Sequence, residues 1–427
     1  MSIKVFYSSK PLKGEITIPS DKSISHRAVI FSSIAKGASI IKNFSKGQDP
    51  QSSLQICKAL GADIEQNESE IIVKSKGKYF PNNNDIVLNC GNSGTTIRIM
   101  AGILVGQNFN SILIGDDSLS ARPMKRIIEP LTLMGANIES NTGKAPLKIL
   151  ASNLNGINYE SNIASAQVKS CVLLAGLYAN GTTTYKEIYP SRNHTEIMLS
   201  AMGANINASN GIISVSKSEL CPVNIEIPGD ISSAAFFIVA ASIVPNSNII
   251  IKNVGLNETR SGIIKILKKM GANIEILDKR EVCGEDIGDI RVEYTNELKA
   301  CEISGEIIPT LIDEIPVIAV LATQAQGTTI IKDAQDLRNK ESDRIKLTVS
   351  ELKKLGADIE ETQDGMIING KTELKGGVEV NSYKDHRLAM SLYVAGLVCQ
   401  KEILINEFEW VNISFPEFES LMNNLTN

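Results

Sequence analysis

Residues 234–241 read Ala-Ala-Phe-Phe-Ile-Val-Ala-Ala, a run with no polar side chain on any face. A helix that is apolar all round belongs in the interior of a protein. The run belongs to a helix rich in Ala, Gly and Ser that is followed by a turn and a β-rich segment, and five other stretches of the chain show the same order. The six copies cover residues 27–44, 95–114, 168–188, 233–254, 315–333 and 387–406. The sequence therefore predicts a fold built around six buried helices.

A second pattern alternates with the first. Its five clear copies end in Leu/Met-Gly-Ala-Asn/Asp-Ile, at residues 60–64, 134–138, 202–206, 270–274 and 355–359. Upstream of the fourth copy, Ile263, Ile266, Leu267 and Met270 follow helical spacing, which predicts an amphipathic helix. The Gly predicts a left-handed helix stop, and the Ile begins a strand. A sixth such helix is expected at residues 417–425.

The repeats predict an α/β (α+β) protein of two domains with three units each, because six units exceed one ordinary core. The β-rich run at residues 3–7 has no helix before it, and the helix at 417–425 has no strand after it. We therefore expect the two ends to meet. The N-terminal domain would hold residues 19–228, and the C-terminal domain residues 1–18 and 229–427. A linear chain divided near residue 228 is the alternative.

The composition indicates a globular protein and argues against several classes. The chain has 427 residues, 43% of them hydrophobic, and a net charge of -5, which disfavours a general nucleic-acid binder. No run of about 18 apolar residues predicts a membrane span, and no signal-peptide core is present. The 7 Cys lack a Cys-x-x-Cys pair and the 3 His lack ligand spacing, which favours reduced thiols in the cytoplasm and disfavours a zinc site.

Polar motifs stand at the start of each buried helix. A helix start carries about half a positive charge and free N–H groups. If the buried helices run side by side, their starts would converge on a cleft that attracts a small polyanion. The motifs occupy residues 21–23, 92–95, 165–167, 229–233, 312–314 and 384–387.

Basic residues in loops reinforce this interpretation. Arg98, Arg122, Arg192, Lys340 and Arg344 lie among Gly, Ser, Asn and Pro, where binding groups tend to be placed. The planar guanidinium suits bidentate contacts to phosphate or carboxylate. No Gly-x-x-x-x-Gly-Lys-Ser/Thr or Gly-x-Gly-x-x-Gly nucleotide motif accompanies them. The alternative is ordinary solvated surface charge.

Asp313, Glu341 and Lys22 are the candidate proton-transfer groups, because each stands beside other charges that can shift its pKa. Asp313 could equally cap a helix, and Glu341 could pair with Lys340 or Arg344. From the residues alone, the chain is an enzyme that acts between two domains on phosphorylated or carboxylated small molecules.

The combined motifs resemble those of the 5-enolpyruvylshikimate-3-phosphate (EPSP) synthase family, at residues 19–27, 91–98, 122–124, 165–167, 313, 339–344 and 385–387. The resemblance runs nearly end to end. It implies two domains of three βαβαββ-type repeats each, an inside-out α/β barrel with buried helices, and no metal or organic cofactor. It also implies transfer of the enolpyruvyl group of phosphoenolpyruvate to the 5-hydroxyl of shikimate 3-phosphate. We expect a monomer, because two domains already form a complete cleft.

The family's pattern also implies roles for individual residues. Shikimate 3-phosphate would be bound by Lys22, Ser23, Arg27, Ser165, Ala166, Gln167, Arg192, Asp313 and Lys340. Phosphoenolpyruvate would be bound by Lys22, Gly94, Arg122, Gln167, Arg344 and Arg387. Asp313 is the choice for proton transfer at the hydroxyl, with Glu341 and Lys22 as candidates for the other protons.

Two other functions remain open at this point. The related UDP-N-acetylglucosamine enolpyruvyl transferases usually carry a reactive Cys in the loop corresponding to residues 111–124, and this chain has none there. They also have Lys-Asn where this chain has Lys22-Ser23. A non-catalytic anion-binding module is the second alternative, but carboxylates such as Asp313 and Glu341 would weaken anion binding.

Overall fold

The computed structural model describes residues 1–67, 69–82, 85–209 and 211–426, which form two compact units. Unit 1 comprises Met1–Pro19, Gly229–Arg280 and Asp286–Asn427, and unit 2 comprises Ser20–Pro228 and Glu281–Glu285. Each unit has a hydrophobic core of its own.

Residues 281–285 correct the division expected from the sequence, which gave them to the C-terminal domain. They form the tip of a hairpin between β16 (Asn273–Val282) and β17 (Glu285–Glu293) and belong to unit 2. Glu285 Oε1 lies 2.6 Å from His194 Nδ1, and Cys283 Sγ donates to the Asn224 carbonyl. These contacts hold the tip in unit 2 although its strands continue in unit 1.

Six small sheets repeat one plan, in which a parallel pair of strands is extended by antiparallel neighbours. In order across each sheet, those of unit 2 are β14 (Ile225–Glu226), β3 (Lys36–Lys42), β5 (Glu70–Lys76), β4 (Asp63–Gln66); β6 (Ile86–Asn89), β7 (Ser111–Ile114), β9 (Lys144–Leu150), β8 (Asn137–Asn141); and β10 (Asn158–Ser161), β11 (Thr182–Glu187), β13 (Ile212–Ser216), β12 (Ile206–Ser209). Those of unit 1 are β16, β17, β15 (Asn248–Gly255), β2 (Lys13–Thr17); β18 (Glu302–Ile303), β19 (Gly327–Ile331), β21 (Met366–Gly370), β20 (Asp358–Glu361); and β1 (Ile3–Val5), β23 (Ile403–Asn406), β22 (Glu379–Asn381).

The N-terminal strands complete two sheets of unit 1. β1 pairs antiparallel with β23, with Ile3 opposite Ile405, and β2 pairs parallel with β15, with Lys13 opposite Asn248. The sixth amphipathic helix expected near the C-terminus is α13 (Phe418–Asn424). Segments from both ends of the chain therefore build the same unit.

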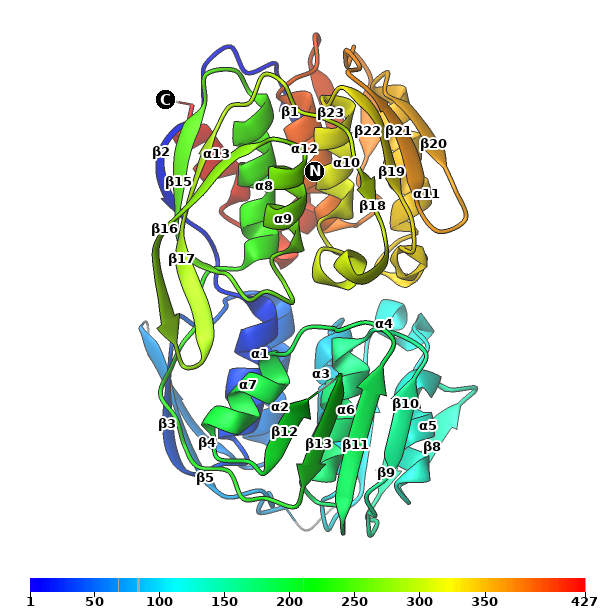
Figure 1. The fold of residues 1–427 in the computed structure, drawn as a ribbon. Helices are drawn as coiled ribbons and strands as arrows, with labels where there is room; N and C mark the ends of the chain where they lie inside the picture. The colour runs from blue at the N-terminus through cyan, green and yellow to red at the C-terminus, as the bar shows by residue number, and fades with distance from the viewer. Residues whose placement is uncertain (68, 83–84, 210, 427) are drawn as a thin grey trace. The chain divides into compact units, whose positions relative to one another are not determined.

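The central helices of unit 1 are buried on nearly every side, as their composition predicted. α8 (Ile231–Ile243), α10 (Ile315–Thr323) and α12 (His386–Gly396) pack against one another (Figure 1). They also lie against β15, β21 and β23, respectively. The sheets therefore cover the outside of a helical centre.

Unit 2 repeats this arrangement with polar helix starts. α3 (Gly94–Leu104) packs against both α1 (Lys22–Ser32) and α6 (Ala166–Gly176). The only residues of these helices that are not buried are Lys22, Thr95, Ala166 and Gln167, all in the first turn. Each helix therefore supplies the core with most of its length and exposes its polar start.

The amphipathic helices end at the repeated glycines, as predicted. They are α2 (Gln48–Ala59), α5 (Lys125–Leu133), which follows the short α4 (Asp117–Ala121), α7 (His194–Ala201), α9 (Gly262–Lys269) and α11 (Arg344–Lys354). The glycine after each helix has a positive φ, from 79° at Gly203 to 99° at Gly356. This left-handed conformation, which glycine adopts without steric cost, ends the helix and turns the chain into the next strand.

Two features of the structure concern membrane spans and cysteine chemistry. No helix among the described residues is long and apolar enough to cross a membrane. All seven cysteines are free, and burial raises the pKa of Cys57 and Cys399 to about 12. These two buried thiols therefore stay protonated and unreactive at neutral pH.

Candidate active site

In unit 2, the start of α1 presents a lysine beside a capped helix terminus. The Asp21 side chain accepts a hydrogen bond from the Ile24 N–H at 2.8 Å and caps the helix. Lys22 is the next residue, its side chain 29% exposed, and its Nζ lies 3.1 Å from Asp49 Oδ2 in α2. A partly exposed ammonium at a helix start is suited to an anionic ligand.

Arg27 is buried one turn further along α1 and is held by neutral groups. Its Nε donates to Thr195 Oγ1 at 2.7 Å, Nη1 to the Ser23 carbonyl at 2.9 Å and Nη2 to Ser170 Oγ at 2.8 Å. Burial lowers the pKa of Arg27 to about 10, with Glu196 opposing this shift. Arg27 therefore stays charged at neutral pH and joins α1, α6 and α7.

The starts of α3 and α6 meet through Gln167. Arg98 Nη1 donates to Gln167 Oε1, and Gln167 Nε2 donates to Thr95 Oγ1 at 2.9 Å. A Cβ added at Gly94 would lie 3.1 Å from Arg98 Nη1 and 3.2 Å from Arg122 Nη1. The absence of a side chain at Gly94 therefore leaves room for two guanidinium groups beside the backbone.

The remaining predicted residues of unit 2 lie at neighbouring positions. Arg192 Nη1 donates to Ser23 Oγ at 3.3 Å, and Arg122 Nη2 donates to Asn92 Oδ1 at 2.7 Å. Ser165 is the N-cap residue of α6, without a side-chain cap bond, and Ala166 is the first residue of the helix. The structure therefore gathers the predicted residues of unit 2 at the starts of α1, α3 and α6 and in adjoining loops.

In unit 1, Asp313 is surrounded by three cationic side chains. Its Oδ1 lies 3.2 Å from Lys340 Nζ and 3.3 Å from Arg344 Nη1, and its Oδ2 lies 4.0 Å from Arg387 Nη2. The N-cap residue of α10 is Glu314, so Asp313 is not the helix cap that the sequence left open. The structure thus joins Asp313 to every basic residue predicted for this unit.

Arg344, at the start of α11, is fully buried and paired with carboxylates. Its Nε donates to Asp385 Oδ2 at 2.8 Å, and its Nη2 donates to Glu341 Oε2 at 2.7 Å. Burial lowers the pKa of Arg344, but Asp385, Glu341 and Asp313 outweigh that effect and raise the pKa above its ordinary value. Burial raises the pKa of Asp385, and Arg344 reverses this, so that the Asp385 pKa is lowered. Glu341 is therefore an ion-pair partner of Arg344.

Two buried carboxylates that hold these arginines were not assigned from the sequence. Asp385 caps α12 by accepting from the Arg387 N–H at 2.9 Å while it also accepts from Arg344. Glu314 Oε1 lies 3.6 Å from Arg387 Nη1 and 3.3 Å from Arg260 Nη1. The sequence did carry a signal for both: Glu314 directly follows Asp313, and Asp385 lies in the motif at residues 384–387 that also holds Arg387.

The predicted residues form one cluster in each unit, and the two clusters offer different chemical groups. The cluster of unit 2 offers ammonium, guanidinium and hydroxyl groups at helix starts, which suit phosphate and carboxylate groups. The cluster of unit 1 offers a carboxylate, Asp313, among cations, which can accept a proton from a nearby hydroxyl. Within the described ranges, no group of three His, Cys, Asp or Glu side chains has the arrangement of a metal site.

Comparison with known proteins decides the family. Residues 6–422 match the EPSP synthase family, described as EPSP synthase (3-phosphoshikimate 1-carboxyvinyltransferase). The chain belongs to this family. It is 54% identical to the 3-phosphoshikimate 1-carboxyvinyltransferase of Thermodesulfovibrio yellowstonii, with 99% of each chain covered. It is 50% identical to the enzyme of that name from Bacillus subtilis, with 97% of each chain covered.

Solved structures of EPSP synthases and other enolpyruvyl transferases share the fold. EPSP synthase from Acinetobacter baumannii is 40% identical, with a TM-score of 0.90 over 100% of this chain and 98% of that chain. The enolpyruvyl transferase NikO from Streptomyces tendae is 16% identical, with a TM-score of 0.80 over 99% and 97%, and shows the fold alone. The family and the α/β fold with buried helices that the motifs predicted are thus confirmed.

Proposed function

We propose that this chain transfers the enolpyruvyl group of phosphoenolpyruvate to the 5-hydroxyl of shikimate 3-phosphate and releases phosphate. The observation that carries this conclusion is the family match over residues 6–422, nearly the full chain. The reaction belongs to the shikimate pathway, which supplies chorismate for aromatic amino-acid biosynthesis. The acceptor distinguishes this activity from that of the UDP-N-acetylglucosamine enolpyruvyl transferases.

Shikimate 3-phosphate carries a phosphate and a carboxylate, and the proposal assigns it to basic and hydroxyl groups. The assigned residues of unit 2 are Lys22, Ser23, Arg27, Ser165, Ala166, Gln167 and Arg192. Asp313 and Lys340 of unit 1 complete the set. Support comes from Arg27, which stays charged although buried, and from the bond between Arg192 and Ser23.

Phosphoenolpyruvate is also multiply anionic, and the proposal assigns it a second set of residues. These are Lys22, Gly94, Arg122 and Gln167 of unit 2 and Arg344 and Arg387 of unit 1. Support comes from Gly94, beside which two guanidinium groups stand, and from Arg344, which buried carboxylates hold in one orientation. Bringing two anionic substrates together requires this compensation of charge and this orientation.

In the proposed reaction, the 5-hydroxyl adds to C2 of phosphoenolpyruvate, and Asp313 accepts the hydroxyl proton. A proton from Glu341 or Lys22 is added to C3, which gives a tetrahedral intermediate. Cleavage of the bond between C2 and the phosphate oxygen releases phosphate, whose leaving oxygen takes up the proton that the hydroxyl gave to Asp313. The group that protonated C3 takes back a proton from C3, which restores the double bond and returns both acid–base groups to their starting states. Support for Asp313 in this role comes from its position among Lys340, Arg344 and Arg387, whose cationic groups lie within 4.0 Å of its carboxylate.

The proposal extends to the organisation of the chain. The two units are its two domains, with residues 281–285 counted in the N-terminal one, and the enzyme is a monomer of the cytoplasm. The separate hydrophobic cores support the division, and the free thiols suit a reducing compartment. Light scattering at micromolar concentration tests the monomer, and a dimer mass would contradict it.

The test of function is phosphate release from phosphoenolpyruvate by the purified chain. Shikimate 3-phosphate, UDP-N-acetylglucosamine and buffer alone are compared as acceptor conditions, with Lys22→Met as the inactive control. Release that requires shikimate 3-phosphate and disappears in Lys22→Met supports the proposal. Release only with the sugar nucleotide, or no release from the folded protein, overturns it.

A further inference from the structure

One buried lysine of unit 2 takes no part in the proposed reaction. Lys169 lies two residues after Gln167 in α6, and 1% of its surface is exposed. Its Nζ lies 2.9 Å from Glu187 Oε1, 2.8 Å from Glu196 Oε1 and 3.0 Å from the Ser191 carbonyl oxygen. An ammonium group has three N–H donors. These three acceptors satisfy all of them.

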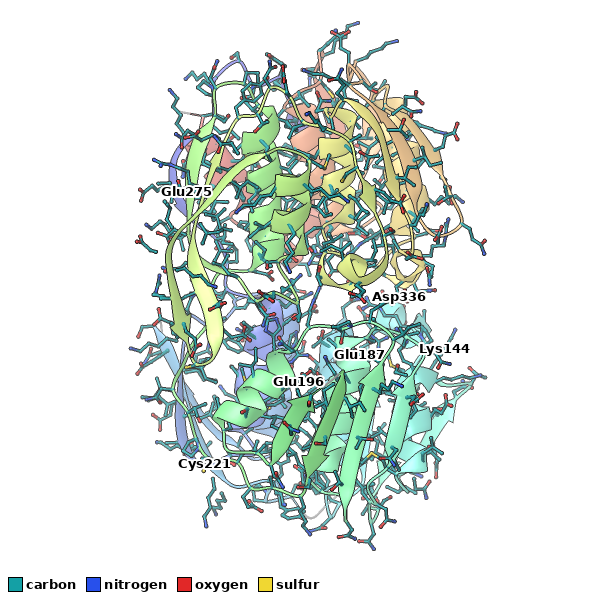
Figure 2. The ribbon with its side chains drawn as sticks, viewed as in Figure 1. Lys144, Glu187, Glu196, Cys221, Glu275 and Asp336 are labelled. Atoms are coloured by element: carbon teal, nitrogen blue, oxygen red, sulfur yellow. The ribbon has the colours of Figure 1, made fainter. Side chains whose placement is uncertain are left out.

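The two carboxylates bracket the segment that carries Arg192. Figure 2 labels both: Glu187 is the last residue of β11, and Glu196 lies in the first turn of α7. Glu187 accepts hydrogen bonds from the Ser191 N–H and from the Ser191 hydroxyl, both at 2.7 Å. Because Lys169 also binds the Ser191 carbonyl, the polar groups of Ser191 are all held by the Lys169–Glu187 pair.

The peptide fixed in this way leads directly into a residue assigned to the substrate. Arg192 follows Ser191, and its Nη1 donates to Ser23 Oγ. The Ser23 carbonyl accepts from Arg27, which also donates to Ser170, the residue after Lys169 in α6. Lys169 therefore stands where α1, α6 and the segment before α7 meet.

We propose that Lys169 is a positioning residue for shikimate 3-phosphate, which fixes the Ser191 backbone and thereby aims the Arg192 guanidinium at the substrate. The inference rests on the proposed function, in which Arg192 binds shikimate 3-phosphate. A neutral side chain cannot replace the ammonium, because Glu187 and Glu196 would then be like charges with side chains only 5% and 10% exposed. Their repulsion, or a proton taken up between them, would loosen the hold on Ser191.

Lys78 provides a control for the loss of a buried lysine. It is 4% exposed, also lies in unit 2, and its Nζ donates to the carbonyls of Leu177 and Ser218. Leu177 is the C-cap residue of α6, at the opposite end of the helix from Lys169. Lys78→Met therefore removes a buried ammonium from the same unit without touching a residue assigned to a substrate.

The experiment is a double-mutant cycle on the full-length chain. Lys169→Met, Arg192→Ala, the double variant and Lys78→Met are assayed by phosphate release, with shikimate 3-phosphate and phosphoenolpyruvate varied in turn. Lys169→Met is expected to raise the KM for shikimate 3-phosphate about tenfold and the KM for phosphoenolpyruvate by less than about twofold. In the Arg192→Ala background it should add less than about twofold, because its effect acts through Arg192. Lys78→Met should leave both KM values unchanged.

Each outcome separates the inference from the function on which it rests. Effects that multiply fully in the double variant, or an equal rise of both KM values in Lys169→Met, overturn the positioning role. An unchanged KM for shikimate 3-phosphate in Arg192→Ala overturns that role together with the assignment of Arg192. An unmodified chain that is inactive with shikimate 3-phosphate overturns the proposed function itself. If Lys169→Met does not fold, Ser191→Ala, which keeps the ion pairs, replaces it in the same cycle with an expected rise of about threefold.

Discussion

The two units hold their buried arginines in opposite ways. Arg27 of unit 2 donates to two hydroxyl groups and one carbonyl, whereas Arg344 of unit 1 contacts three carboxylates. Burial lowers the pKa of both, but the carboxylates of Asp385, Glu341 and Asp313 reverse the shift at Arg344. A guanidinium among neutral groups keeps its charge for an arriving anion, and one among carboxylates is compensated before any ligand arrives.

We infer from this difference that the two units have different roles in the proposed reaction. Unit 2 supplies ammonium and guanidinium groups near the starts of α1, α3 and α6, where Lys22 pairs with Asp49 and Arg27 is held by neutral groups, and these groups serve binding. Unit 1 supplies a carboxylate, Asp313, with three cations within 4.0 Å, and arginines that carboxylates hold in place, which serves proton transfer and orientation.

The largest expected effect is on turnover, at Asp313. Asp313→Ala removes the proposed base and should lower kcat about 1000-fold, while shikimate 3-phosphate still binds. Phosphate release gives kcat, and isothermal titration gives the dissociation constant. Asp358→Ala, at an exposed position in β20, is the control and should leave kcat unchanged. Tighter binding by Asp313→Ala, together with no turnover in the unmodified chain, would identify the chain as a binding module instead.

The second effect is on stability, and it compares the two arginines directly. Arg344→Met leaves buried carboxylates without their counter-charge and should lower the free energy of unfolding by about 3–5 kcal/mol. Arg27→Met leaves mainly neutral acceptors unpaired and should cost about 1–2 kcal/mol. Urea unfolding followed by circular dichroism measures both.

A second substitution sharpens the stability test. Asp385→Asn, introduced together with Arg344→Met, removes one of the stranded charges and should recover part of the lost stability. Equal losses in the two single variants, or no recovery in the double variant, would mean that charge compensation does not distinguish the units.

The third effect is on phosphoenolpyruvate binding, at Gly94 of unit 2. Gly94→Ala places a methyl group 3.1 Å from Arg98 Nη1 and 3.2 Å from Arg122 Nη1, so at least one guanidinium must move. The KM for phosphoenolpyruvate should rise about tenfold, with a smaller change for shikimate 3-phosphate. Gly181→Ala is the control, because its methyl group would meet open space although its φ of 84° strains the backbone. An equal rise in both Gly variants would point to general loss of structure.

The parts of this molecule that could be predicted from its sequence are those set by local chemistry. The helix stop at Gly271 and the helix start at residues 21–23 depend on a few adjacent residues, and both appear where they were expected. The pairing of Arg344 with Asp385 could not be predicted, because Asp385 lies 41 positions away and meets it only through the packing of α11 on α12. The same holds for Glu285, which pairs with His194 across 91 positions and draws the hairpin tip into unit 2.

The smallest expected effect concerns the pH dependence of stability and arises from His26, next to Arg27 in unit 2. His26 Nδ1 lies 2.8 Å from Ser53 Oγ, and its buried Nε2 has no hydrogen-bond partner among the described residues. Burial lowers the pKa of His26 from 6.5 to about 3; Asp49 opposes the shift, while Lys22 and Arg27 add to it. The unit in which Arg27 is held by neutral acceptors thus also keeps the neighbouring histidine neutral.

The sign of the effect follows from proton binding. The unfolded chain protonates His26 near pH 6.5, whereas the folded chain does so only near pH 3, so the unfolded state binds more protons between these values. The neutral His26 therefore contributes stability above pH 6.5, and this contribution is lost as the pH falls toward 3. Between pH 7.5 and 5.5 the loss should be about 1 kcal/mol in the unmodified chain and absent in His26→Gln. Urea unfolding at the two pH values measures it, and an equal loss in both proteins would place the titrating group elsewhere.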